Sequence, residues 1–403
     1  MTRPDSPLRI FLIFLRLGLT SFGGPIAHLG YYRREFVERR RWIDDQTYGD
    51  LVALSQFLPG PASSQTGFAI GLMRGGLPGA IAAFIGFTLP SAIIMLGVAY
   101  GSAMFESDLG AALVHGLKIV AVAVVAQALR GMARSLCPDA PRTFIAFFAL
   151  ATVLLVPGAL MQLIAIAIAG LMGLILCRTG EETPADAPTA PLVLAGRRIL
   201  PALALVLFAA LLLALPQLRS VTDSAVVMLA DIFYRAGALV FGGGHVVLPL
   251  LQASTVESGL IDENAFLAGY GAAQALPGPL FAFSAYLGAV MPLGIPPLAG
   301  AAVALVAIFL PGFLLVYGTL PIWQAMRASR HVRSLLKGVN AGVVGLLAAA
   351  LYDPIWTSSI RSSLDFTLAA GAFLLLTVLN QGSGRVVAMM LAASLALHTA
   401  GLL

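Results

Sequence analysis

Two Pro-Gly-Pro segments interrupt the apolar runs of this chain at matching places, and they constrain its fold more than any other feature. The first lies in LVALSQFLPGPASSQT (residues 51–66), and the second lies in QALPGP (residues 274–279). Proline lacks the amide that a helix interior needs and disfavours helical angles at the residue before it. Each segment therefore predicts a break between two helices. Paired breaks in an apolar chain are typical of transport sites.

The composition places these breaks in a membrane. Of the 403 residues, 59% are hydrophobic and only 11% are charged, which is too little polar surface to cover a soluble domain of this size. Apolar runs of about 15 to 25 residues, separated by short polar breaks, have the length of helices that cross or partly cross a bilayer. Long alternating strands are absent, which favours a helical bundle over a barrel. We expect an all-α polytopic membrane protein.

The chain contains a tandem repeat. RLGLTSFGG (residues 16–24) matches RAGALVFGG (residues 235–243) at one fixed offset. After a slip of one residue, residues 43–61 match residues 261–279, including the shared Leu-Pro-Gly-Pro. The fold class that we predict is therefore two homologous halves, each with broken or re-entrant helices at its SFGG-type and LPGP motifs.

A segment without apolar periodicity separates the halves. Residues 181–198 are rich in proline, alanine, threonine and acids, which is typical of a linker. We therefore expect a first repeat at residues 1–180 and a second at residues 199–403. Residues 199–215 form an added helix with no counterpart in the first half.

Loop charge indicates that the two halves are inverted. The loop 31–45 carries five arginines, whereas its counterpart 245–263 has no lysine or arginine. The next pair reverses, because 102–110 is acidic and 324–337 is basic. Since cytoplasmic loops carry the excess of lysine and arginine, equivalent loops lie on opposite faces. We expect a cytoplasmic N-terminus and a periplasmic C-terminus.

Strict inversion requires an odd number of crossings between equivalent points. The number of crossings between equivalent points is odd if the SFGG-type and LPGP segments are re-entrant pairs of short helices. This arrangement leaves about nine full crossings. Non-helical backbone at membrane depth is allowed only where protein buries it or where it lines a watery cavity.

The helix starts after the breaks suit an anion. Their first amides have no intrahelical partner, and the helix dipole is positive there. Glycine allows close approach to main-chain amides, and a buried glutamine can donate to a substrate oxygen or cap the carbonyls freed at its own break. Our candidates for substrate binding are Gly23, Gly24, Gln56, Pro59, Gly60, Pro61 and Ser63 in the first half, and Gly242, Gly243, Gln274, Pro277, Gly278 and Pro279 in the second.

Four ionisable residues lie in apolar runs. Arg16 and Arg235 occupy equivalent positions, where they either bind the substrate as charge partners or snorkel and bond freed carbonyls. His115 and Lys118 either line a pathway or anchor a helix end. No nucleophile–base pair, metal cluster or cofactor fingerprint is visible, so we expect no enzyme activity, metal, cofactor or nucleic-acid partner.

Several stretches resemble the chromate ion transporter (CHR) family in its long-chain, two-domain form. They are FLRLGLTSFGGPIAHLGYYRREFV from Phe14, WIDDQTYGDLVALSQFLPGPASSQ from Trp42, and FGGGHVVLPLL with ALPGPLFAFSAYLG in the second half. The resemblance implies export of chromate across the bacterial inner membrane and resistance to chromate, with sulfate as a similar dianion. The alternatives are uptake or exchange of sulfate or another oxyanion, or a scaffold without transport. The lipid bilayer is an expected partner, and a homodimer stays open.

Overall fold

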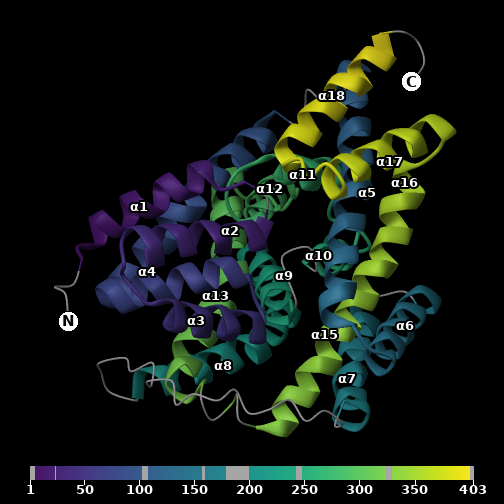
Figure 1. The fold of residues 1–403 in the computed structure, drawn as a ribbon. Coiled ribbons are helices and arrows are strands. Elements are labelled where there is room, and N and C mark those ends of the chain that lie inside the picture. Colours follow the sequence, from purple (N-terminus) through teal and green to yellow (C-terminus); the bar gives the residue numbers. More distant parts are fainter. Residues whose placement is uncertain are drawn as a thin grey trace.

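The chain is built from helices throughout the part that the computed structural model describes (Figure 1). Residues 5–22, 24–101, 108–156, 159–177, 199–241, 247–323, 326 and 329–399 are described. The first half contains α1 (Pro7–Thr20), α2 (Gly24–Tyr32), a π-helical turn (Arg33–Arg39), α3 (Asp45–Phe57), α4 (Ala62–Tyr100), α5 (Asp108–Leu136), α6 (Ala140–Leu155) and α7 (Ala159–Leu176). The second contains α8 (Ile199–Val221), α9 (Ala225–Leu239), α10 (Val247–Thr255), α11 (Glu263–Ala275), a 3-10 turn (Leu280–Ala282), α12 (Phe283–Val290), α13 (Pro297–Thr319), α15 (Arg330–Ala350), a π-helical turn (Leu351–Trp356), α16 (Thr357–Ser359), α17 (Ser363–Thr377) and α18 (Ser383–Thr399).

Helix α4 folds back on itself at two adjacent glycines. Gly75 and Gly76 have non-helical angles, and Gly76 has a φ of 63°. A Cβ at Gly71 would lie 2.5 Å from the carbonyl oxygen of Gly79, so the arms 62–74 and 77–100 pack side by side. In the second half, a Cβ at Gly288 of α12 would lie 2.3 Å from the Gly300 carbonyl oxygen of α13. One bent helix therefore corresponds to two separate helices.

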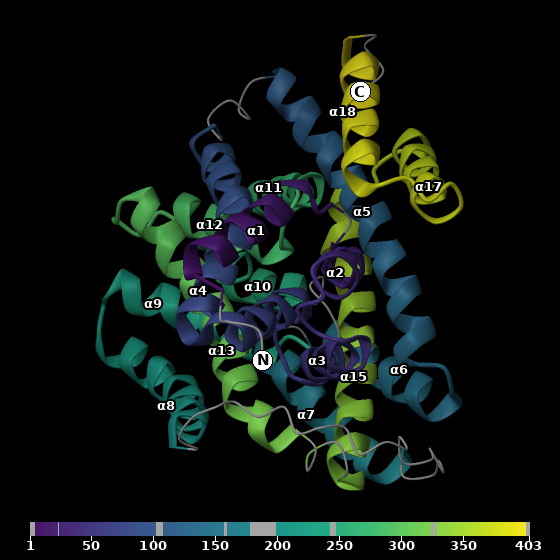
Figure 2. The ribbon, with the colours of Figure 1, turned by 60° about the vertical axis from the view of Figure 1, so that its left-hand side comes forward.

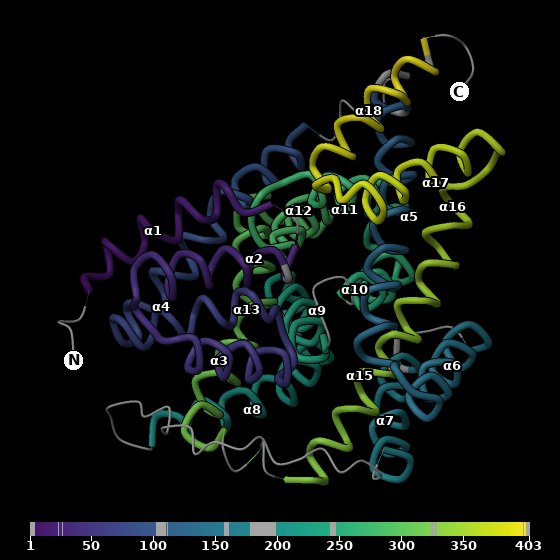
Figure 3. Tube along the Cα trace, viewed as in Figure 1, coloured from purple at the N-terminus to yellow at the C-terminus, as the bar shows by residue number. Residues whose placement is uncertain are grey.

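Each half contains helices that pair as a hairpin. Phe14 of α1 and Tyr32 of α2 have ring centroids 5.7 Å apart, although the chain turns between them at the FGG motif. In the second half, the Tyr286 hydroxyl of α12 donates to the Ala265 carbonyl of α11 over 2.9 Å, so these arms also lie side by side. Figure 3 follows the chain through these turns. The FGG and LPGP motifs thus form or adjoin the hairpin tips.

Matching N-caps begin the helices that lead into the two LPGP motifs. The Asp44 carboxylate accepts from the Thr47 amide over 2.7 Å at the start of α3. The Asp262 carboxylate does the same for the Asn264 amide over 2.8 Å at the start of α11. An aspartate cap satisfies an amide that has no intrahelical partner and favours the positive end of the helix. The repeat therefore extends to local helix chemistry.

The long helices pack against the opposite half. Helix α5 of the first half packs against α17 and α18 of the second, whereas α15 of the second half packs against α6 and α7 of the first. Figures 1 and 2 show α5 and α15 running together, with α17 and α18 towards one end and α6 and α7 towards the other. This reciprocal exchange is the pattern expected when two related halves face each other.

Membrane-spanning length is reached by five of the described helices: α4, α5, α8, α13 and the α15 segment. Long helices alone therefore do not supply the nine or so crossings expected above, since α6, α17 and α18 are shorter apolar helices. The added helix is also longer than expected, because α8 runs to Val221. The linker at 181–198 and the C-terminal Leu403 lie outside the described residues. The predicted class, a helical multi-pass membrane protein of two related halves, is confirmed.

Two equivalent glycines let α1 and α9 touch their neighbouring helices, and they generate a prediction. A Cβ at Gly18 of α1 would lie 2.5 Å from the Phe87 carbonyl oxygen, and one at Gly237 of α9 would lie 2.0 Å from the Ile308 carbonyl oxygen. Gly18→Ala and Gly237→Ala should each lower the free energy of unfolding by about 1–3 kcal/mol, because backbone cannot yield as a flexible side chain does. Unfolding of the purified protein in SDS measures this.

The matched control is Gly97→Ala, because a Cβ at Gly97 meets nothing within 4 Å. Unfolding curves of all three variants that coincide with the wild type would show that these helix contacts are not tight.

Candidate functional site

Two reciprocal backbone hydrogen bonds join the breaks of the two halves. The Gly60 amide of the first LPGP motif donates to the Val240 carbonyl over 2.6 Å. The Gly278 amide of the second motif donates to the Ser21 carbonyl over 2.9 Å. Ser21 and Val240 are equivalent, because each ends the helix that leads into its FGG motif. The Pro-Gly-Pro tip of each half is therefore held by the other half.

Only glycine fits at these two amides. Gly60 has a φ of 125° and Gly278 a φ of 98°, a region that side chains rarely enter. A Cβ at Gly60 would lie 3.1 Å from the Gly312 Cα, and a Cβ at Gly278 would lie 2.8 Å from the Ser91 hydroxyl. Ser91 and Gly312 are themselves equivalent, since each follows the proline inside the long helix of its own half. The contacts repeat the reciprocal pattern of the hydrogen bonds.

The region around the two bonds, Gly60 to Val240 and Gly278 to Ser21, is the crossing of the two tips. The start of α4 presents polar groups at this crossing. Its N-cap, Pro61, provides no side-chain hydrogen bond, so the amides of the first turn have neither an intrahelical partner nor a side-chain cap. Ser64 Oγ and Gln65 Oε1 are buried and have no hydrogen-bond partner among the described residues. Gln65 Nε2 instead donates to the Pro59 carbonyl over 2.8 Å and to the Gly312 carbonyl over 3.2 Å. The backbone amides and the Ser64 hydroxyl can donate to an oxyanion, whereas the Gln65 oxygen can only accept.

The corresponding start in the second half is apolar. A 3-10 turn, Leu280–Ala282, precedes α12, where α4 begins directly. Phe281 and Phe283 occupy the positions of Ser63 and Gln65, and their rings are buried. The expectation that both helix starts offer an anion site therefore has side-chain support in the first half alone.

His28 on α2 links three parts of the crossing, and the sequence analysis did not single it out. Its Nε2 lies 3.2 Å from the Ser21 carbonyl oxygen, and its Nδ1 lies 3.3 Å from Ser63 Oγ. A carbonyl only accepts, so Nε2 carries the proton, and in the neutral ring Nδ1 accepts from the Ser63 hydroxyl. Because the second half has Val247 at the equivalent position, the repeat gave no signal for this residue.

The predicted residues at the LPGP tips differ in exposure. Gln56 is exposed, whereas its equivalent Gln274 is buried and its Nε2 has no partner among the described residues. The carbonyl-capping alternative considered for Gln56 is instead the observed role of Gln65. Ser63, Gly60, Pro61, Pro277 and Pro279 are buried, and Pro59 and Gly278 are half-buried.

The predicted FGG glycines are only partly described. Gly24 begins α2 with a φ of 77°. Gly23, Gly242 and Gly243 lie outside the described residues. The crossing is therefore defined by the residues just before these glycines, Ser21 and Val240.

The equivalent arginines have different surroundings. Arg16 is exposed on α1. Arg235 on α9 forms an ion pair with the buried Asp231 one turn earlier, and Arg219 of α8 reaches the same carboxylate oxygen over 3.2 Å. Arg235 therefore has a buried carboxylate partner that the alternatives from sequence did not include.

The two predicted pathway residues tie α5 to the second half. His115 Nε2 lies 2.7 Å from the Asp365 carboxylate of α17. The buried Lys118 ammonium donates to the Asn264 side-chain oxygen of α11 over 2.9 Å. Both residues lie away from the helix end and make contacts between the halves.

The crossing predicts that one substitution loosens both halves. Gly60→Ala or Gly278→Ala strains the backbone by about 1–3 kcal/mol and pushes the tip from its partner. Amide hydrogen exchange should therefore rise at residues 58–62 and 276–280 in either variant, as measured by mass spectrometry.

Gly294→Ala is the control, because Gly294 also has a positive φ, of 71°, but a Cβ there meets nothing within 4 Å. Exchange that stays slow at both tips in the Gly60 and Gly278 variants would contradict the proposed coupling.

Comparison with known proteins matches each half of the chain. The Chromate transporter family matches residues 8–174 and 227–397, which leaves the linker and α8 between the matched regions. A chromate transport protein of Pseudomonas aeruginosa is 29% identical over 356 residues, which cover 87% of this chain and 81% of that protein. No solved structure matches the chain.

Two further relatives extend this similarity. A probable chromate transport protein of Synechococcus elongatus is 26% identical over 341 residues, or 84% of this chain and 82% of that protein. An uncharacterized transporter of Methanocaldococcus jannaschii is 26% identical over 349 residues, or 85% of this chain and 83% of that protein. Since the two matched regions cover most of both halves, the chain belongs to the chromate transporter family.

Proposed function

We propose that this protein exports chromate from the cytoplasm, and that the anion passes the crossing of the two Pro-Gly-Pro tips. The observation that carries this proposal is the reciprocal pair of hydrogen bonds, Gly60 to Val240 and Gly278 to Ser21. They fix the interrupted backbone beside the start of α4, which can supply its first-turn amides and the Ser64 hydroxyl to an oxyanion. A scaffold gains nothing from such interruptions.

The membrane potential favours export of a dianion. Moving charge across an inside-negative membrane is worth about 2.3 kcal/mol per charge per 100 mV, or roughly 4.6 kcal/mol for two charges. Charge alone therefore requires no coupled proton or counter-anion. Sulfate has the same charge and tetrahedral shape and is the natural competitor, and its uptake or exchange is the alternative function.

The export proposal predicts lower chromate accumulation. Cells that make the protein should retain several-fold less radiolabelled chromate than cells with an empty vector, and excess sulfate should reduce the difference. Equal retention, with the protein present in the membrane, would contradict export. Higher retention would indicate uptake instead.

We further propose an inverted arrangement in the inner membrane. The hairpins of the first half would open towards the cytoplasm, and those of the second half would open towards the periplasm. The exchanged packing of α5 and α15 supports this arrangement, as does the concentration of arginine in the loop 31–45. The N-terminus is then cytoplasmic, and the C-terminus periplasmic.

This topology predicts opposite labelling of two exposed loops. A cysteine replacing Arg41 should be protected from an impermeant thiol reagent in intact cells, and one replacing Ser258 should react. Both variants are made after Cys137 and Cys177 are changed to serine, so that no native thiol contributes. Labelling of both positions from the same face would refute the inverted arrangement.

A further inference from the structure

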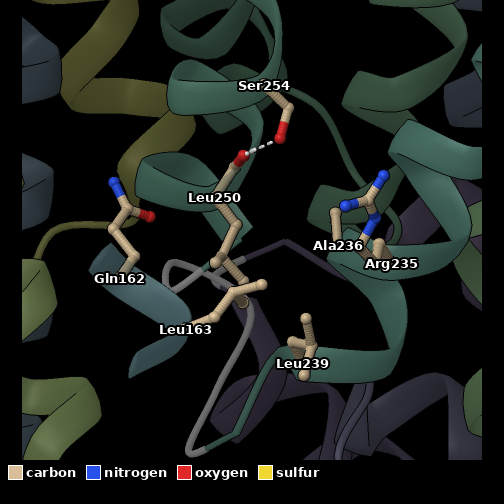
Figure 4. Close-up of a pocket in the computed structure, with 7 residues that line it drawn as sticks. All are labelled: Gln162, Leu163, Arg235, Ala236, Leu239, Leu250 and Ser254. Carbon is tan, nitrogen blue, oxygen red and sulfur yellow. Dashed lines mark hydrogen bonds between the residues drawn. The ribbon is translucent and has the colours of Figure 1, made fainter. Parts of the chain in front are cut away.

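A small cavity lies beside the crossing, between helices of the two halves (Figure 4). Its volume is about 40 Å³, which is room for a few water-sized groups and too little for an organic substrate. Helix α7 of the first half forms one wall, and α9 and α10 of the second half form the others. The lining residues are Gln162, Leu163, Arg235, Ala236, Leu239, Leu250 and Ser254.

Arg235 in the cavity lining belongs to a charge cluster with excess positive charge. A single oxygen of Asp231 accepts from both Arg235 and Arg219, and its other oxygen has no partner among the described residues. Two guanidinium groups and one carboxylate leave a formal charge of +1. Asp231 is 1% exposed, whereas the Arg235 side chain is 36% exposed. The positive group, and not the negative one, therefore faces the space.

Gln162 supplies a polar group that lacks a partner. It is 5% exposed, and its Oε1 has no hydrogen-bond partner among the described residues. A buried polar atom left unpaired costs about 1–3 kcal/mol, so a cavity lined by such an atom favours a ligand that satisfies it. By turning about its last torsion, the amide presents either its NH₂ or its oxygen. It can thus donate to an oxyanion or accept from a protonated one.

The cavity adjoins the crossing along α9. Leu239, which lines it, precedes Val240, whose carbonyl accepts the Gly60 amide. Arg235 lies one helical turn further from the tip. The cavity and the crossing therefore lie next to each other along α9.

We propose that this cavity is a second binding site, for a small tetrahedral oxyanion such as chromate or sulfate. This second site deepens the proposed function, and it rests on that function only for the identity of the transported ion. The guanidinium fork of Arg235 binds anion oxygens, and Gln162 orients the ion from the α7 wall. Leu163, Leu239 and Leu250 exclude larger polar ligands.

Two substitutions and one matched control test the site. Arg235→Lys keeps the charge beside Asp231 but loses the fork, and Gln162→Leu removes the amide at similar volume. Arg219→Lys is the matched control, because Arg219 also pairs with Asp231 but does not line the cavity. The melting temperature of each purified protein in detergent is measured against the concentration of chromate or sulfate. The concentration that gives half of the maximal rise is the first half-saturating concentration. Transport of chromate into proteoliposomes gives a second half-saturating concentration.

Each cavity variant should raise both half-saturating concentrations about tenfold, the equivalent of one charge-assisted hydrogen bond. Both half-saturating concentrations of Arg219→Lys should stay within about twofold of the wild-type values. If both cavity variants match the wild type, or if the control weakens binding as much as they do, the second site is refuted while the export proposal stands. If the wild type moves no chromate, but its stabilisation by either oxyanion depends on Arg235 and Gln162, the export proposal fails while the second site stands.

Discussion

Backbone hydrogen bonding across the two halves is the constraint on which the rest of this structure depends. The prolines of each LPGP motif interrupt a helix in apolar surroundings, where a freed amide or carbonyl is costly to leave unpaired. Neither half satisfies the glycine amide of its own tip, because Gly60 donates to Val240 and Gly278 to Ser21. The glycines, the exchanged helices and the close contacts at Ser91 and Gly312 all serve to keep these two bonds in place.

The two halves share a backbone arrangement but differ in the polar side chains at equivalent positions. The first half brings hydroxyls, a histidine and a glutamine to the crossing, where the second half has Phe281, Phe283 and Val247. The second half instead carries the Asp231–Arg235 pair. At the position of Asp231 the first half has Leu12, so Arg16 has no carboxylate one turn away. Each half thus carries polar groups that the other lacks at the equivalent positions.

Most of the fold could be predicted from the sequence pattern, because proline and glycine determine the backbone conformation at their own positions. The positions of the two breaks, the repeat and the apolar helices were all readable in this way. The site was less predictable, since the crossing depends on which distant groups meet. Gln56 precedes its break as Gln274 does and yet is exposed, while Gln65 reaches the freed carbonyls from the other side. His28 and Asp231 act through contacts with Ser63 and Arg219, which no spacing in the chain reveals.

The exchanged packing of the long helices bears on how the protein is made. Helix α5 is synthesised long before α17 and α18, which cover it in the finished molecule. Until those last helices emerge from the ribosome, α5 must present Lys118 and His115 to lipid or to the insertion machinery without Asn264 and Asp365. The first half is therefore an incomplete folding intermediate during biogenesis. A chain that ends before α11 and α17 lacks both of these partners of α5.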